Sequence, residues 1–341
     1  MKTLDVSIII VSWNTRDLLR DCLRSIYDQA GSTSLEVTVV DNGSSDGSAE
    51  MVKTEFPGVV LIQNAENRGF AAANNQGIKA ARGRYVLLLN PDTALLNDAL
   101  EKVMAFADSH SEAAVVGCRV LNLDRTLQPT CFMFPSLLNM LLSTIYLYKL
   151  FPKNRFFGRE RMTWWDRNDF REVDVVTGCF MLVRRGAIEA VGLMDERFFM
   201  YGEETDWCYR FNQAGWKVMF TPTAEIIHLG GQSSKQVAVE MSLQLRAGIL
   251  QFFRRNRPYA TYLAACLLVA LWFGVRMPVW LSKGLVCPRH RKDSFLRAGM
   301  YLGGFVRSLM GWKALSWRKD SAVPELSAQV LMSSRHQRSL C

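Results

Sequence analysis

Three carboxylates, Glu203, Glu204 and Asp206, lie within four positions of one another in the stretch FFMYGEETDWCYR. Aromatic residues flank them on both sides, which is unusual for a run of charge that is simply solvated. A positioned carboxylate can remove a proton from a hydroxyl, so the stretch is a candidate for general-base catalysis. A helix start is the alternative, because acids favour the first turn and Gly215 would end such a helix. That alternative leaves the aromatic neighbours unexplained.

A second set of polar residues follows a β-branched run in the stretch VVDNGSSDGS. Asp41 can accept from the N–H of a nucleobase while the backbone amides of a following helix face a phosphate. The alternative is an ordinary loop in which Ser and Asp cap the helix. The loop lacks the dinucleotide pattern G-x-G-x-x-G, and the P-loop pattern G-x-x-x-x-G-K-[ST] occurs nowhere in the chain. A dinucleotide-dependent oxidoreductase and a P-loop enzyme are therefore disfavoured.

Two further stretches suggest a metal site. In LLLNPDT, Asn90 and Asp92 follow an apolar run, where a carboxylate could hold a divalent cation against a diphosphate. As an alternative, Asn-Pro-Asp is simply a good turn. In AEIIHLGGQSS, His228 precedes two glycines that would allow close approach of the backbone, although a lone histidine is more often structural.

The elements that must position these residues are predicted from periodicity. Strands are expected at 6–14, 35–41, 59–64 and 85–92, and helices at 16–31, 46–56 and 69–82. This alternation favours an α/β fold with a mostly parallel, doubly wound sheet flanked by helices. Ligands bind such sheets beyond the carboxyl ends of the strands. The polar groups expected at that edge are Trp13-Asn14, Asp41-Asn42, Asn64 and Asn90-Pro91-Asp92. Beyond residue 112 the alternation fades, with strands expected at 113–122 and 172–185 and an apolar stretch at 135–152.

The charge distribution divides the chain near residue 250. Residues 251–341 carry 15 Lys/Arg and 3 Asp/Glu, a balance of +12, whereas residues 1–250 carry 26 and 29, a balance of −3. Within the basic part, 258–275 holds 18 uncharged residues flanked by arginine, which is marginal for a membrane span of about 20 residues. Basic flanks and interleaved Trp and Tyr favour contact with an anionic membrane surface, either as a helix lying on it or as one span at about 258–280. Binding to nucleic acid is disfavoured, because no motif for it is visible.

The eight cysteines are scattered singly, without C-x-x-C spacing, and are expected to be reduced thiols. No signal peptide is evident, so the protein is expected at the cytoplasmic face of the membrane.

In this order, the stretches VSIIIVSWN, VVDNGSSDGS, NRGFAAANNQGI, LLLNPDT, TGCFMLVRR, VGLMDERFFMYGEETDWCYR and HLGGQSS resemble family 2 glycosyltransferases of GT-A (Rossmann-like) fold. The chain looks most like the rhamnosyltransferase-like branch. The resemblance implies a GT-A domain over 1–235, with a nucleotide-sugar half at about 1–112 and an acceptor half at about 113–235. A helical, membrane-proximal region would follow at 236–320, and a flexible tail at 321–341.

The resemblance also implies roles for individual residues. It places five residues in the nucleotide pocket: Asn14, Asp41, Asn67, Arg68 and Asn90. Asn90-Pro91-Asp92 stands where the family has its D-x-D motif. Asp92 and His228 would be the ligands of a divalent cation, Mg²⁺ or Mn²⁺. The catalytic group would be Glu204 as general base, with Glu203 and Asp206 beside it.

The implied reaction is a single displacement with inversion, which moves one hexose or deoxyhexose such as rhamnose from a nucleoside-diphosphate sugar. The acceptor would be a hydroxyl of a lipid-linked or cell-envelope glycan. A nucleotidyltransferase is one alternative, but SWNTRDLL does not supply the basic loop that it needs. A processive polysaccharide synthase is another, although QFFRR has Arg255 where the Q-x-x-R-W motif has Trp. A non-catalytic carbohydrate-binding protein would not need metal and base residues together.

Overall fold

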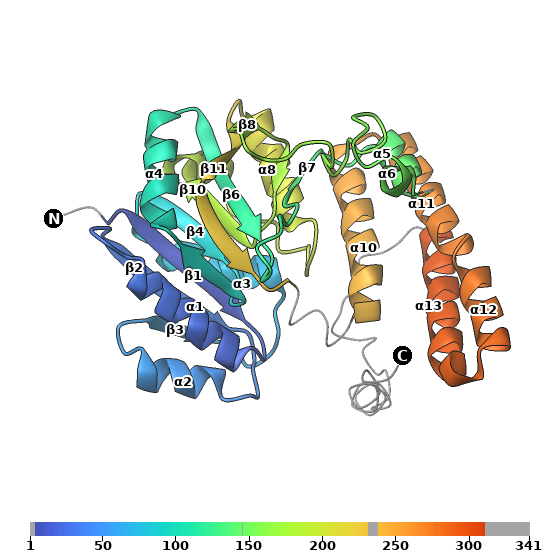
Figure 1. Cartoon of the computed structure of the whole chain (residues 1–341), viewed down its shortest axis with the longest axis horizontal. Helices are drawn as coiled ribbons and strands as arrows, with labels where there is room; N and C mark the ends of the chain where they lie inside the picture. Colours follow the sequence, from blue (N-terminus) through green and yellow to red (C-terminus); the bar gives the residue numbers. More distant parts are fainter. Residues whose placement is uncertain (1–3, 145, 231–237, 311–341) are drawn as a thin grey trace.

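The computed structural model describes residues 4–144, 146–230 and 238–310, and combines one large sheet with a group of helices at its side (Figure 1). The strands are β1 (Val6–Ser12), β2 (Leu35–Asp41), β3 (Val60–Gln63), β4 (Tyr85–Leu89), β5 (Thr93–Leu96), β6 (Ala113–Leu121), β7 (Cys131–Phe132), β8 (Arg171–Glu172), β9 (Val175–Val176), β10 (Phe180–Arg184) and β11 (Lys217–His228). The helices are α1 (Arg16–Asp28), α2 (Ser48–Glu55), α3 (Phe70–Ala80), α4 (Ala99–Ser109), α5 (Leu137–Thr144), α6 (Leu147–Leu150), α7 (Arg185–Val191), α8 (Glu203–Gln213), α10 (Ala238–Asn256), α11 (Tyr259–Gly274), α12 (Met277–Val286), the 3₁₀ helix η1 (Pro288–His290) and α13 (Arg291–Leu309).

The sheet is covered by helices on both faces, as its apolar runs predict. In β1, Ile8 and Ile10 pack into a core with α1, α2 and α4, whereas Ile9 faces the core on the side of α3, α7 and α8. All three isoleucines are fully buried. A strand enclosed on both faces needs apolar residues at every position, and this is why the run does not alternate.

Nine strands form the sheet in the order β3-β2-β1-β4-β10-β6-β11-β5, with β8 paired to β11, while β7 and β9 pair separately. β1, β2, β3 and β4 are parallel, and β6 and β11 are parallel to each other. Antiparallel β10 lies between β4 and β6, and β5 and β8 also run against β11. Most strands therefore run in one direction, as predicted, but the sheet is mixed.

Two predicted strands are wrong in extent. The run 85–92 divides: β4 ends at Leu89, and β5 begins at Thr93 and pairs with β11. Pro91 has no N–H to donate to a ladder, so the chain turns between the two strands. The run 172–185 likewise breaks into β8, β9 and β10, which pair with three different partners.

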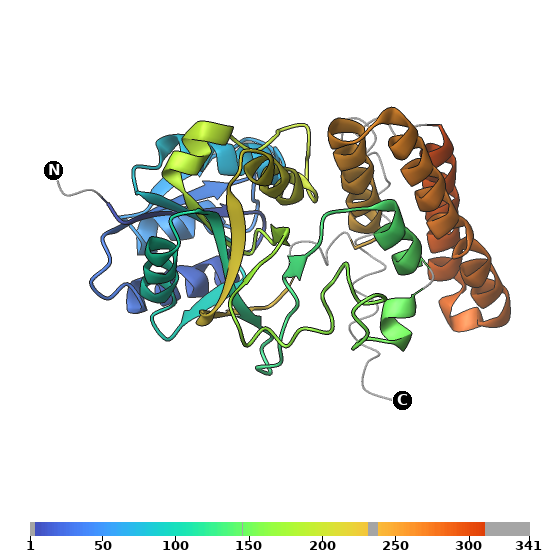
Figure 2. The same cartoon turned by 90° about the horizontal axis from the view of Figure 1, so that it is seen from above.

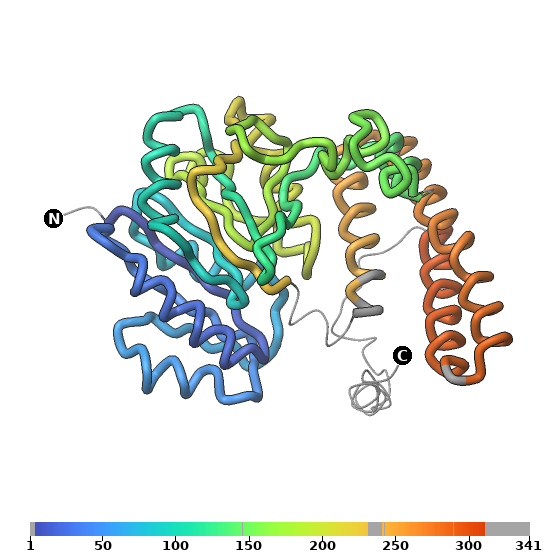
Figure 3. The backbone as a smooth tube through the Cα atoms, viewed as in Figure 1, coloured from blue at the N-terminus to red at the C-terminus, as the bar shows by residue number. Residues whose placement is uncertain are grey.

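The basic C-terminal helices form a second body with its own core. Leu250, Phe252 and Phe253 of α10 pack with Tyr262, Val269 and Phe273 of α11, and all are buried. In two perpendicular views α10 lies between the sheet and α11 to α13 (Figures 1 and 2). The segment between β7 and β8, green in Figure 3, leaves the sheet, reaches these helices through α5 and α6, and returns. The predicted domain limits stay predictions, and the tail 321–341 lies outside the described residues.

Candidate active site

The carboxyl ends of the parallel strands form one edge, as predicted, because the strands are in register. Ser12 of β1 lies opposite Asp41 of β2, and Asp41 lies opposite Gln63 of β3. Asn14 follows with a left-handed φ of 53°, and its side-chain oxygen accepts from the N–H of Ser45 at 2.8 Å. Asp41 is 3% exposed, and its Oδ1 is buried without a hydrogen-bond partner. That oxygen is free to accept from the N–H of a bound ligand.

Asn42 organises the neighbouring loop. Its Nδ2 donates to Asn67 Oδ1 at 2.8 Å, and its Oδ1 accepts from Asn64 Nδ2 at 3.1 Å and from the backbone N–H of Arg68 at 3.0 Å. The predicted pocket residues Asn67 and Arg68 are thus fixed beside Asp41. Asn42 was expected at this edge but was not predicted to hold the loop, since its partners lie 22 to 26 residues away.

The nucleotide edge and the acid-rich stretch meet at Gly69. A Cβ there would stand 2.3 Å from the carbonyl oxygen of Phe199, and the φ of Gly69 is +83°. The next residue, Phe70, donates its backbone N–H to the same oxygen at 2.7 Å. Only glycine permits this approach. The contact places the chain that leads into α8 directly against the loop of Asn67 and Arg68.

The predicted metal ligands are brought together from distant parts of the chain. His228 ends β11, and its Nε2 lies 3.3 Å from Asp92 Oδ1 and 3.3 Å from Asn90 Nδ2. Asp92 is 6% exposed. Antiparallel pairing of β5 with β11 makes this contact, because it sets His228 opposite Thr93.

Gln128, which the sequence did not single out, orients the imidazole of His228. Its Nε2 donates to Asn122 Oδ1 at 2.9 Å, so its Oε1 is the acceptor that faces His228 Nδ1 at 2.6 Å. Nδ1 therefore carries a hydrogen, which leaves Nε2, on the side of Asp92 and Asn90, as the ring nitrogen that a metal ion could bind.

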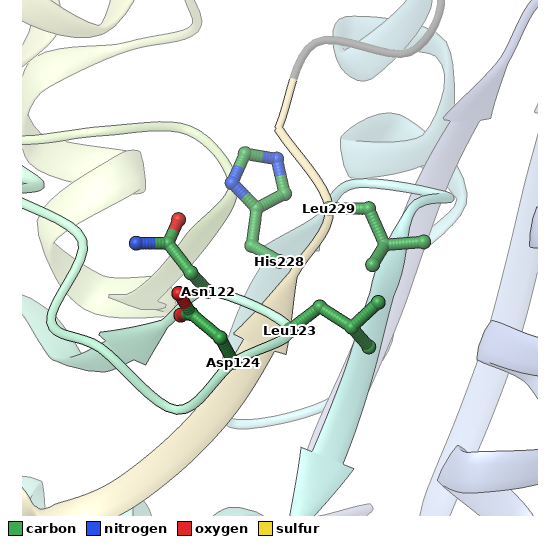
Figure 4. A pocket seen from close by; sticks show the side chains of 5 residues that line it. All are labelled: Asn122, Leu123, Asp124, His228 and Leu229. Carbon is green, nitrogen blue, oxygen red and sulfur yellow. The ribbon is translucent and has the colours of Figure 1, made fainter. Parts of the chain in front are cut away.

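The chemistry of this pair fits a divalent cation. Adjacent ligands of an octahedral ion, each about 2.1 Å from it, stand about 3 Å apart. Within the described ranges no group of three or more His, Cys, Asp or Glu could hold a metal, so the remaining positions would belong to phosphate and water. A pocket of about 500 Å³ opens beside the pair, lined by Asn122, Leu123, Asp124, His228 and Leu229. Figure 4 shows the imidazole beside Asn122, with Leu123 and Asp124 on the loop after β6.

The acids at the start of α8 are in two different environments. Glu203 is 3% exposed, and Oε2 of Glu203 and Oε2 of Glu204 are both buried without a hydrogen-bond partner. Burial, followed by the charge of Glu204, holds the pKa of Glu203 well above its ordinary value. Burial also raises the pKa of Glu204. The charge of Glu204 opposes ionisation of Glu203, so the buried pair resists carrying two negative charges at once.

Asp206 is fully buried, but it is paired. Its carboxylate lies 2.9 Å from Arg210 Nε and 3.2 Å from Arg255 Nε, and Asn256 Nδ2 donates to it at 2.9 Å. Arg255 also contacts Asp195. Two of the three partners come from the end of α10, so Asp206 ties α8 to the C-terminal helices. The predicted helix start at these acids is confirmed: α8 begins at Glu203, after Gly202, and ends at Gln213.

Comparison with known proteins shows what the chain is similar to. The family model "Glycosyl transferase family 2" matches residues 7–192. An N-acetylglucosaminyl-diphospho-decaprenol L-rhamnosyltransferase of Mycobacterium tuberculosis is 29% identical over 206 residues, which cover 57% of this chain and 66% of that relative, just under two thirds of its length. The low-salt glycan biosynthesis hexosyltransferase Agl10 of Haloferax volcanii is 24% identical over 80% of this chain and 84% of its own.

Solved structures show the same fold. The mannosyltransferase PcManGT of Pyrobaculum calidifontis, in complex with GDP-Man and Mn²⁺, has a TM-score of 0.55 at 14% identity, over 90% of this chain and 88% of its own. GalNAc-T7 with UDP, GalNAc and Mn²⁺ has a TM-score of 0.52 at 16% identity, over 66% of this chain and 43% of its own. The predicted GT-A arrangement is confirmed by this likeness.

Proposed function

Since the chain belongs to glycosyl transferase family 2, we propose that it moves one sugar from a nucleoside-diphosphate sugar to a hydroxyl of a lipid-linked glycan acceptor, with inversion at the anomeric carbon. The observation that supports this proposal is the contact of Gly69 and Phe70 with Phe199, which brings the chain leading into α8 against the loop of Asn67 and Arg68. A fold that only bound nucleotide would not need an acid-rich loop there.

The donor would bind across the carboxyl edge of the sheet. Asp41 offers its unpaired Oδ1 to a base N–H, and Asn67 and Arg68 line the same edge. A divalent cation, Mg²⁺ or Mn²⁺, held by Asp92 and His228 would offset the charge that develops on the departing diphosphate. Gln128 keeps the imidazole oriented for that task.

Glu204 would accept the proton of the attacking hydroxyl. The acceptor oxygen forms a bond to the anomeric carbon while the bond from that carbon to the diphosphate oxygen breaks. The electron pair of the broken bond leaves with the nucleoside diphosphate. A base on the face opposite the leaving group produces inversion. Burial, and then the charge of Glu204, holds the pKa of the neighbour Glu203 well above its ordinary value, which disfavours a second negative charge beside the base.

Two relatives support the class of substrate. The mycobacterial relative is named for transfer of L-rhamnose to a diphospho-decaprenol acceptor, and the haloarchaeal one for hexose transfer in glycan biosynthesis. A deoxyhexose or hexose donor and an isoprenoid diphosphate acceptor are therefore the first to test.

An acceptor of this kind requires contact with a membrane, and α11 offers a suitable face. By length and composition, Tyr259–Val286 is the one stretch among the described residues that could cross a bilayer. One face of α11 is buried against α10, whereas Leu263, Leu267 and Leu271 are 45%, 61% and 45% exposed. Arg276 interrupts the stretch and is bonded to Thr144. These features favour a helix that lies in the interface over one that spans it.

The proposal is tested by incubating the protein and Mn²⁺ with a panel of nucleotide sugars, with and without an N-acetylglucosaminyl diphosphoisoprenoid. Release of nucleoside diphosphate that depends on the acceptor, together with one added sugar on the lipid, is expected. Release of inorganic diphosphate in a parallel reaction that supplies nucleoside triphosphates and sugar 1-phosphates would indicate a nucleotidyltransferase instead. Long products would indicate a processive synthase. The latter is disfavoured because Arg255, at the position of the missing Trp, is committed to Asp206 and Asp195.

A further inference from the structure

Four cationic side chains gather between α10, α11 and the segment that carries α5 and α6, away from the acids of α8. The guanidinium carbons of Arg246 and Arg276 lie 4.2 and 4.0 Å from the ring centre of Trp272. Arg276 also stacks on Tyr146 at 4.5 Å, and Lys149 stands over the same Tyr146 ring at 4.7 Å. The fourth cation is Arg161, over Tyr148 at 5.2 Å. We call Arg161, Arg246, Arg276 and Lys149 the cationic cluster.

None of these four cations forms an ion pair within the part of the chain that the structure describes. Arg276, only 8% exposed, donates solely to uncharged oxygens: the hydroxyl of Tyr146 and the backbone carbonyls of Trp272 and Thr144. Nε of Arg246 is buried and has no hydrogen-bond partner.

One acid, Glu160, lies near the cluster. Burial raises the pKa of Glu160, and the charges of Arg161 and Arg246 oppose that shift. Burial lowers the pKa of Arg246 to about 10; Glu160 opposes that shift, and Arg276 and Arg161 add to it. Four basic side chains face one carboxylate, so the cluster has an excess of positive charge. Buried cations are costly unless an anion compensates them.

Exposed apolar side chains lie near the cluster in the chain. Leu271 and Val275, next to Trp272 and Arg276 in the chain, are 45% and 48% exposed. Leu141, one turn before Thr144 on α5, is 41% exposed. Arg161 and Lys149 lie at the exposed side of the group. Positive charge beside exposed leucines suits a molecule with an anionic head and an apolar chain.

The cluster is distinct from the transfer site. On α10, Gln244 donates to the carbonyl of Met200 at 3.3 Å, and Gly248 packs against the carbonyl of Tyr201. Arg246 lies half a turn from both, because successive residues of a helix are 100° apart, and it faces α11 instead. The two sites thus lie on opposite sides of α10.

We propose that the cationic cluster binds the phosphate of a lipid, with the guanidinium of Arg246 as its principal ligand and the lipid chain along the exposed leucines of α5 and α11. Arginine binds phosphate through two parallel N–H donors, and Trp272 and Tyr146 hold the guanidinium groups in place for it. The phosphate can belong to a membrane phospholipid or to an isoprenoid diphosphate. Only the second source rests on the proposed function.

The test compares Arg246→Gln with Arg254→Gln, a matched control that removes an exposed arginine from the same helix. Binding of the full chain is measured to vesicles of phosphatidylcholine with and without phosphatidylglycerol, and to geranylgeranyl diphosphate in detergent. We expect Arg246→Gln to weaken binding of one of these phosphates by about 10- to 100-fold, the worth of a hydrogen bond to a charged group. The control should remain within about twofold.

The two arms identify the source of the phosphate. Loss confined to vesicles with phosphatidylglycerol assigns the site to phospholipid, and loss with geranylgeranyl diphosphate in detergent assigns it to an isoprenoid diphosphate. Slow release of nucleoside diphosphate by transfer to water, without acceptor, is measured in parallel, because it reports on the proposed function and should not change. If Arg246→Gln does not fold, Arg161→Gln probes the cluster from its exposed side. Wild-type binding of both lipids by folded variants overturns the inference.

Discussion

Replacing the three acids of α8 one at a time should separate catalysis from stability. Glu204→Gln keeps the shape of the side chain but cannot accept a proton. Asp206→Asn keeps its shape as well, but removes the negative charge that Arg210 and Arg255 share. Glu204→Gln should abolish turnover without lowering the free energy of unfolding. Asp206→Asn should lower the free energy of unfolding while turnover persists.

The expected sizes follow from the two environments. A positioned general base contributes about 100- to 10,000-fold, so Glu204→Gln should raise the barrier by about 3 to 5 kcal/mol. Breaking a buried ion pair by removing one partner costs about 3 to 5 kcal/mol of unfolding free energy. For Asp206→Asn the lower end applies, because the side chains of Arg210 and Arg255 remain 18% and 30% exposed and can be partly solvated.

Three measurements on each variant decide the matter. Turnover is measured at saturating donor and acceptor, donor affinity by calorimetry, and unfolding free energy from urea denaturation of the full chain. Glu204→Gln should bind donor as the wild type does. A stable but inactive Asp206→Asn, together with an active Glu204→Gln, would show that the base is two residues further along α8 and would refute the assignment.

Three further predictions concern the metal ligands, Glu203 and the exposed leucines of α11. Asp92→Ala and His228→Ala should each raise the Mn²⁺ concentration needed for half-maximal activity by at least about tenfold, and an unchanged Mn²⁺ titration would exclude that residue as a ligand. Glu203→Gln should leave unfolding free energy unchanged at pH 4 and raise it at pH 8: the pKa of Glu203 is held well above its ordinary 4.5 by burial and Glu204, so the wild type loses stability as pH rises above 4.5. Equal stability of both proteins at pH 8 would contradict this. Leu263→Glu with Leu267→Glu should weaken binding to anionic vesicles by at least about tenfold, and high salt should weaken binding of the wild type. Vesicle binding that does not change with salt concentration would favour a spanning helix.

Much of the nucleotide half could be predicted from the sequence, because its elements are local. An unbroken apolar run such as VSIIIVS has few structures open to it other than a strand enclosed on both faces, and polar residues after such runs must lie at its carboxyl end. The helix of the acids could likewise be predicted, since first-turn carboxylates and the glycine after the last turn are signals within a few residues. Each of these inferences depends on neighbours in the chain.

The tertiary structure decided which of these residues meet. Gln128 orients His228 from 100 residues away, and no local pattern distinguishes it from any other glutamine. In the sequence, Asp206 and Glu204 are both acids among aromatic residues. The docking of α10 brings Arg255 to Asp206, whereas Glu204 keeps an oxygen without a hydrogen-bond partner. Strand order likewise decided which metal ligands meet. Because β5 pairs with β11, Asp92, which directly precedes β5, lies against His228 at the end of β11. Burial and partners give a carboxylate its chemistry, and both are properties of the packed chain.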